Sequence, residues 1–213
     1  MINLKRSKIY RHRKDFLWQY IKNDYKVLDI GNLGFLKNRI HGNSFYKETV
    51  SKFENVKFFG IDIEPIGKAE SEFPNQIQHN VNEGIPFKND FFDLVYMGQV
   101  LEHLENVNFV LKDINRALKP DGILVIDVPN PYSIDRILKY LIKRTEDLGE
   151  ESHLVFYTPG SLTRILKLNS FKVNEIATDW NLISLKYKII PKIIRNGFGS
   201  HILISAKALV PNN

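Results

Sequence analysis

The feature that most constrains the fold is a regular alternation of short apolar runs with segments of helical periodicity. The runs that predict buried strands are 27–30, 56–63, 76–81, 91–97 and 123–128. Apolar residues spaced three or four apart predict helices at 13–22, around 46–53 and at 107–118. Pro120 and Gly122 predict a turn that ends the third of these helices. Such alternation is typical of an α/β protein with a parallel sheet.

The last third of the chain has a different pattern. Residues 134–144 predict a basic amphipathic helix, and an acidic loop follows at 146–152. Leu162, Ile165 and Leu166 mark a further helix after Pro159 and Gly160. Strands are expected at 171–176 and 201–208, whereas 182–194 has no clear assignment. We find no repeat or linker, so residues 1–213 are interpreted as one domain. Within it, 1–24 is an expected N-terminal helical extension and 131–160 an expected substrate lid.

Composition excludes several classes of function. The 213 residues include no cysteine, which rules out disulfides, thiolate metal sites and cysteine nucleophiles. No apolar run approaches the length of a membrane helix, and the basic N-terminus lacks the apolar core of a secretory signal. A cytoplasmic protein is therefore expected. The net charge of +6 fits a nucleic acid, anionic lipid or phosphorylated partner, or simply a lysine-rich surface.

Two strand ends carry residues suited to binding a nucleotide-like ligand. The run at 27–30 leads into a turn with Gly31 and Gly34, and glycine lets a ligand approach the backbone closely. Asp62 ends the next strand, where a carboxylate can accept hydrogen bonds from both hydroxyls of a ribose. The structural alternatives are a plain tight turn for the glycines and a helix cap for Asp62.

Further motifs follow in a fixed order. They are Pro86-Phe87, Phe92-Asp93-Leu94-Val95, Leu101-Glu102-His103-Leu104 and the run from Arg116 to Gly122. Together with Asp29-x-Gly31 and Gly60-x-Asp62, this order resembles the class I S-adenosylmethionine-dependent methyltransferases, especially the small-molecule group. The resemblance spans about residues 25–177. Each motif alone is weak, but six in order are specific.

The resemblance implies a Rossmann-like three-layer sandwich, with a seven-stranded, mostly parallel sheet and an antiparallel last strand. It also implies S-adenosyl-L-methionine as cofactor, lying over the first strands. The positions carried over to the cofactor site are Asp29, Gly31, Asn32, Gly34, Asp62, Ile63, Asn80, Val81 and Gln99. Two usual glycines of the turn are replaced by Leu33 and Phe35, and Asn80 stands where an aspartate is common.

The catalytic residues are less well defined, because methyl transfer from a sulfonium needs mainly alignment and exclusion of water. His103 is the candidate general base, and its alternative is a histidine that packs at a helix start. His153 is the candidate substrate contact. In ubiquinone-pathway O-methyltransferases, acidic residues and the corresponding histidine are associated with a metal. Gln99 replaces the first of those acids, so no metal is expected.

The sequence therefore predicts a methyltransferase for a small-molecule acceptor, with an oxygen of a sugar or lipid-linked intermediate favoured by analogy. The basic helix at 134–144 fits either a lid or peripheral membrane contact. An RNA methyltransferase is a less favoured alternative, because no RNA-binding module accompanies the positive charge. A non-catalytic protein that retains the fold is a further alternative, suggested by Leu33 and Phe35. The oligomeric state stays open.

Overall fold

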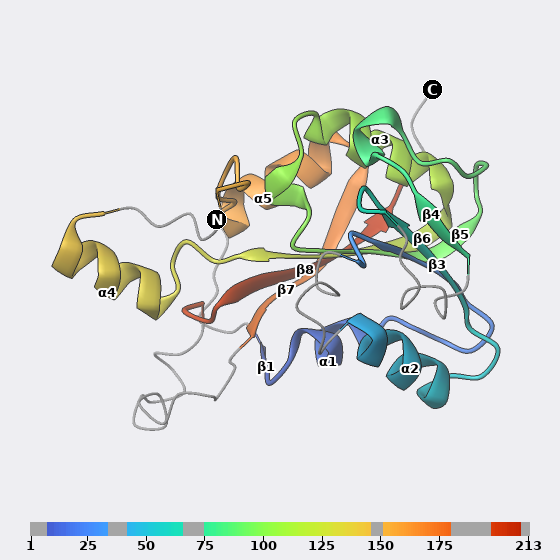
Figure 1. Ribbon diagram of the computed structural model, residues 1–213, viewed down its shortest axis with the longest axis horizontal. Coiled ribbons are helices and arrows are strands. Elements are labelled where there is room, and N and C mark those ends of the chain that lie inside the picture. The colour runs from blue at the N-terminus through green and yellow to red at the C-terminus, as the bar shows by residue number, and fades with distance from the viewer. Residues whose placement is uncertain (1–7, 34–41, 66–74, 146–150, 180–196, 210–213) are drawn as a thin grey trace.

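The computed structural model describes residues 8–33, 42–65, 75–145, 151–179 and 197–209. Within them, one eight-stranded sheet has the strand order β1-β7-β8-β6-β5-β2-β3-β4, with helices on both faces (Figure 1). The five strands from β6 to β4 in this order run parallel, and β8 is antiparallel to both β6 and β7. The predicted three-layer α/β architecture and antiparallel last strand are confirmed.

The strands follow the apolar runs of the sequence. Their bounds are β1 Ile9–Tyr10, β2 Lys26–Ile30, β3 Lys57–Asp62, β4 Gln76–Gln78, β5 Phe92–Gly98, β6 Leu118–Pro129, β7 Phe171–Asp179 and β8 His201–Ala208. The central strands β2, β5 and β6 are buried on both faces, which explains their nearly continuous apolar composition. Their carboxyl ends meet at one edge of the sheet, where the predicted site residues lie.

Helices pack on both faces of the sheet. Helices α1 (Arg13–Trp18) and α2 (Gly42–Lys52) pack on one face, against a core that includes Val27, Leu94 and Leu203. The other face is covered by α3 (Val107–Ala117) and α5 (Pro159–Leu168). Two 3-10 turns, η3 (Val81–Glu83) and η4 (Leu101–His103), follow β4 and β5. Helix α4 (Ile134–Lys143) projects away from both layers (Figure 1).

The structure corrects three details of the sequence prediction. The sheet has eight strands rather than seven, because Ile9 and Tyr10 pair with Thr178 and Asp179 at the edge of β7. The N-terminal extension is thus not wholly helical, and its helix ends at Trp18. Strand β6 begins at Leu118 rather than at Ile123, so the turn expected at 119–122 lies within its bounds, where Asp121 has a φ of 66° and the register with β5 shifts.

Two further predictions fall partly or wholly outside the described residues: the acidic loop, of which 146–150 is not described, and the segment 182–194. Among the helices that are described, none combines the length and apolar composition needed to cross a lipid bilayer.

Candidate functional site

The turn after β2 is shaped for close backbone approach. Gly31 has a φ of 75°, a conformation that favours glycine, and its N–H donates to the Ile61 carbonyl at 2.8 Å. A Cβ at this position would overlap the Cγ2 atom of Val100. Both the backbone conformation and the space therefore require glycine here. The sequence prediction of a specialised turn at Gly31 agrees with this geometry, whereas Gly34 and Phe35 lie outside the described residues.

Asp62 faces this turn from the end of β3. Its carboxylate accepts a hydrogen bond from the Leu33 backbone N–H at 2.6 Å, and another from the Glu64 N–H at 2.9 Å. The residue is only 5% exposed. Two neighbouring strand ends are thus joined through one carboxylate, and its position is fixed at the mouth of the Gly31 turn.

Asn32 is held differently. Its side-chain amide forms a reciprocal pair with that of Gln76, with N···O distances of 2.7 and 3.0 Å. The pair lies over Gly60, where a Cβ would overlap the Gln76 side chain. The Asn32 side chain therefore ties the turn to edge strand β4, which leaves its backbone as the part available to a ligand.

Three of the predicted cofactor residues, Ile63, Asn80 and Val81, follow the ends of β3 and β4. Ile63 is 63% exposed, and Val81 is buried at the start of η3. Asn80 caps η3, and its Oδ1 accepts from the Asn82 N–H at 3.0 Å. Asn82, which the sequence analysis did not single out, has a buried Oδ1 with no hydrogen-bond partner. A buried acceptor of this kind is costly until a donor satisfies it.

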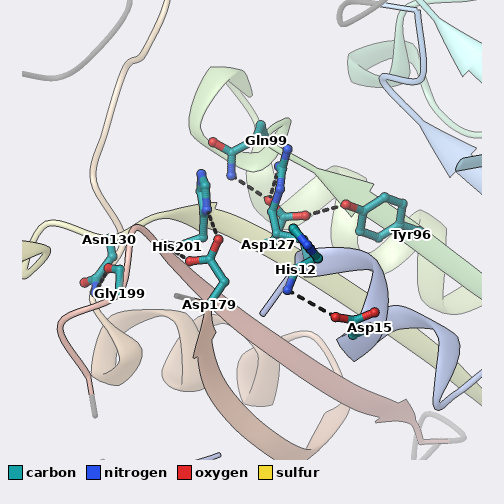
Figure 2. Close-up of polar contacts among 10 residues, drawn as sticks. His12, Asp15, Tyr96, Gln99, Asp127, Asn130, Asp179, Gly199 and His201 are labelled. Carbon is teal, nitrogen blue, oxygen red and sulfur yellow. Dashed lines mark hydrogen bonds and ion pairs between the residues drawn. The ribbon is translucent and has the colours of Figure 1, made fainter. Parts of the chain in front are cut away.

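A buried network lies at the ends of β5 and β6, centred on Asp127 (Figure 2). The Asp127 carboxylate accepts hydrogen bonds from Arg13 Nη1 at 2.7 Å, from Gln99 Nε2 at 2.6 Å and from the Tyr96 hydroxyl. Gln99 has a φ of 56°, and its backbone N–H donates to the Asp127 carbonyl at 3.0 Å. Gln99, predicted from the sequence, is therefore positioned by a residue that the sequence did not reveal.

Charge pairing keeps this network ionised. Burial opposes the charged forms of both Asp127 and Arg13, but their mutual attraction outweighs it. The guanidinium, with His201 behind it, lowers the pKa of Asp127, and the carboxylate raises the pKa of Arg13. Burial, and then the charge of Asp127, raises the pKa of Tyr96 well above its ordinary value. Tyr96 is therefore a neutral hydroxyl donor at neutral pH.

An aspartate–histidine pair borders the same network (Figure 2). His201 Nδ1 lies 2.7 Å from Asp179 Oδ2, and the His201 backbone N–H donates to Asp179 Oδ1, also at 2.7 Å. A carboxylate only accepts, so Nδ1 carries a proton and Nε2 is the ring nitrogen left for other contacts. The arrangement orients an imidazole at the carboxyl edge of the sheet.

His103, the candidate general base, and His153, the candidate substrate contact, lie next to each other. Their rings meet edge to face with centroids 4.6 Å apart, and His103 Nδ1 lies 3.1 Å from the Ser152 carbonyl oxygen. His153 Nε2 lies 4.0 Å from the buried Glu102 carboxylate. Ligand atoms of Glu102, His103 and His153 all lie within 4.8 Å of one another, a spacing that could hold a metal ion. The expected absence of a metal stays a prediction.

Asp29 is a further buried carboxylate at this edge, near the end of β2. It is 7% exposed, and burial, followed by the negative charges of Asp62 and Asp127, raises its pKa well above the ordinary value. A positively charged ligand placed here would favour the ionised form. The edge thus combines fixed carboxylates with a glycine turn, which suits a ligand that carries both hydroxyls and positive charge.

Comparison with known proteins identifies the family. A model described as a methyltransferase domain matches residues 2–176. The chain belongs to this methyltransferase family. The family and the fold imply S-adenosylmethionine as cofactor. The residues present fit it: the Asp62 carboxylate can accept hydrogen bonds from ribose hydroxyls, the turn at Gly31 fits only glycine, and Asn82 offers a buried acceptor.

Several solved structures and curated proteins are similar to this chain. A methyltransferase from Archaeoglobus fulgidus described as SAM-dependent has a TM-score of 0.63 at 23% identity, covering 92% of this chain and 91% of that one. The [4+2]-cyclase SpnF has a TM-score of 0.61 at 14% identity, covering 93% and 80%. A ubiquinone biosynthesis O-methyltransferase of Bartonella tribocorum is 24% identical over 131 residues, 57% of this chain and 51% of that protein. The chain spans 46–63% of the length of the curated relatives it matches.

The raised pKa of Asp29 gives a testable pH dependence of stability for this methyltransferase domain. A folded pKa above the unfolded value means that the folded state loses stability as pH rises from about 4, the ordinary pKa of an aspartate. We therefore expect Asp29→Asn to raise the Tm at neutral pH, and the difference from the unmodified chain to close below about pH 4. Thermal unfolding followed by circular dichroism across this range measures it.

Asp90→Asn is the matched control for this prediction, because Asp90 is an exposed aspartate in a turn. Its Tm should follow that of the unmodified chain at every pH. A lower Tm for Asp29→Asn at neutral pH would show that the Asp29 carboxylate is instead stabilised by the fold.

Proposed function

We propose that this protein transfers a methyl group from S-adenosylmethionine to a small-molecule acceptor, at an oxygen of a sugar or lipid-linked intermediate. The observation that carries the proposal is the Asp62 carboxylate, which is fixed against the turn of Gly31. The name of the Bartonella relative, an O-methyltransferase, supports oxygen as the acceptor atom. An RNA substrate rests only on the positive net charge, and a non-catalytic role rests only on the atypical turn.

The cofactor would be held by groups from successive strand ends. Asp62 would accept hydrogen bonds from the ribose hydroxyls, while Ile63 and Val81 would pack on the adenine. Asn80 and the buried Oδ1 of Asn82 offer acceptors for its amino group. The turn at Gly31 to Gly34 would pass beneath the methionine, with the backbone of Asn32 facing the ligand. Asp29 and Gln99 would complete that side, and the Asp29 charge suits an ammonium group.

The acceptor would enter between the network of Asp127 and the paired histidines. When bound, the cofactor supplies an electrophilic methyl group on a sulfonium. The protein must then align an acceptor oxygen, exclude water and receive the proton of a hydroxyl. We assign the proton to His103, with His153 as an acceptor contact, and we propose that residues 131–160 close the site as a lid. The pair of His201 and Asp179 is a second imidazole at the same edge.

Isothermal titration calorimetry with S-adenosylmethionine tests the cofactor site. Charge-assisted hydrogen bonds are worth about 1.5–3 kcal/mol, so we expect Asp62→Ala to weaken binding roughly tenfold or more. Asp62→Asn retains one acceptor oxygen and should lose less. Asp90→Ala, at an exposed position, is the control and should bind as the unmodified chain does. Absence of binding by the unmodified chain at millimolar concentration would favour a non-catalytic protein.

A comparison of two histidine variants tests the proton acceptor. Acceptors are first found by screening hydroxylated sugars and phenols for release of S-adenosylhomocysteine. General-base catalysis contributes on the order of 10²–10⁴-fold, so His103→Ala should lower kcat by about that factor with an unchanged Kd for the cofactor. His201→Ala is the matched comparison. If kcat falls only in His201→Ala, the role passes to the aspartate–histidine pair.

A further inference from the structure

Helix α4 is the least buried helix of the described chain. None of its ten residues is buried, whereas α3 buries five and α5 buries three. Its apolar side chains are largely in solvent: Ile142 is 78% exposed, Leu141 is 54% and Leu138 is 47%. Apolar surface of this kind, concentrated on one helix, usually marks an interaction site. The helix also stands away from both layers of the sheet (Figure 1).

The helix separates apolar from cationic side chains. At 100° per residue, Ile134, Leu138, Leu141 and Ile142 fall on one side, and the cations Arg136, Lys139 and Lys143 fall on the other. Arg144 continues the positive charge past the helix end, and Asp135 lies in the first turn. This composition is typical of helices that lie in the surface of a membrane.

One part of the apolar side lines a hollow. Ile137, Tyr140 and Leu141 enclose a cavity of about 400 Å³ together with Phe156 and neighbouring residues. The Arg136 guanidinium lies 4.9 Å from the centroid of the Phe156 ring. Leu154 and Val155, which precede Phe156, are 58% and 39% exposed. The hollow beside α4 is therefore lined in part by Phe156, three residues after His153, which we propose as an acceptor contact.

We propose that α4 docks on an anionic lipid bilayer, with Leu138 and Ile142 at the boundary of headgroups and acyl chains. Lys139, Lys143 and Arg144 would then lie near lipid phosphates. Charge supports this partner, because the cations that accompany the apolar stripe complement the negative surface of such a bilayer. A nucleic acid would satisfy the cations but not the apolar stripe. The inference deepens the proposed function, since it places the lid where a lipid-linked acceptor resides.

Co-sedimentation of the full chain with vesicles tests the proposal. We expect binding to vesicles of phosphatidylcholine mixed with phosphatidylglycerol, weaker binding to phosphatidylcholine alone, and a decrease with added salt. The double variant Leu138→Ser with Ile142→Ser should lower the partition coefficient roughly tenfold or more. Leu168→Ser removes a side chain that is 77% exposed on α5 and is the matched control. It should bind vesicles as the unmodified chain does.

Two charge-reversal variants distinguish electrostatic attraction to anionic lipid from non-specific binding. Lys139→Glu with Lys143→Glu should abolish the preference for phosphatidylglycerol, whereas Lys167→Glu on α5 should not. No binding to anionic vesicles at low salt, or equal losses in the α5 controls, would overturn the proposal. Concentration-dependent dimers in sedimentation velocity that disappear in the α4 variants would also overturn it and assign the surface to a second copy.

Calorimetry with S-adenosylmethionine on the same variants keeps this inference distinct from the proposed function. The α4 variants should bind the cofactor normally, because α4 contributes none of the predicted cofactor residues. A chain that binds anionic vesicles but no cofactor would contradict the methyltransferase activity and leave the docking surface standing. A chain that binds the cofactor but no vesicles would do the reverse.

Discussion

The buried carboxylate of Asp127 is the constraint on which the acceptor side of the structure depends. An ionised carboxylate that is removed from water must be paired and hydrogen-bonded. Asp127 meets this requirement with Arg13, Gln99 and Tyr96, which come from α1, the end of β5 and β5 itself. The N-terminal segment is thereby fixed to the sheet, and Gln99 is held in a left-handed conformation. One charge therefore positions Gln99, one of the predicted cofactor residues.

Negative charge at this edge is the electrostatic counterpart of the expected cofactor. Asp29, Asp62 and Asp127 lie close enough for the latter two to raise the pKa of Asp29. Arg13 neutralises Asp127, but Asp29 has only other carboxylates among the charges that shift its pKa. A cationic ligand at this edge would favour the ionised form of Asp29. A positive overall charge of +6 thus coexists with a locally acidic site.

The sequence was sufficient for features set by local patterns. Apolar runs located the central strands, and Gly31 and Asp62 were identified because each lies directly after its strand. Arg13, Asp127 and His201 were missed because their contacts join positions from 22 to 114 residues apart, and no short motif encodes such a pairing. Strand β1 was missed because two residues carry no periodicity. The turn expected at 119–122 was also set locally, because these residues lie in a register shift between the pairs Phe92–Leu118 and Leu94–Ile123 rather than in the ladder with β5.

The same division between local and distant contacts explains why the acceptor is harder to infer than the cofactor. The predicted cofactor residues are consecutive strand ends, so any chain with this topology can present them. The acceptor side that we propose would be assembled from α1, η4, the segment before α5 and the start of β8, which the fold does not constrain to particular residues. A cyclase shares the fold, which shows that topology alone does not fix the reaction. The choice of substrate must therefore depend on the side chains around Asp127, His103 and His201.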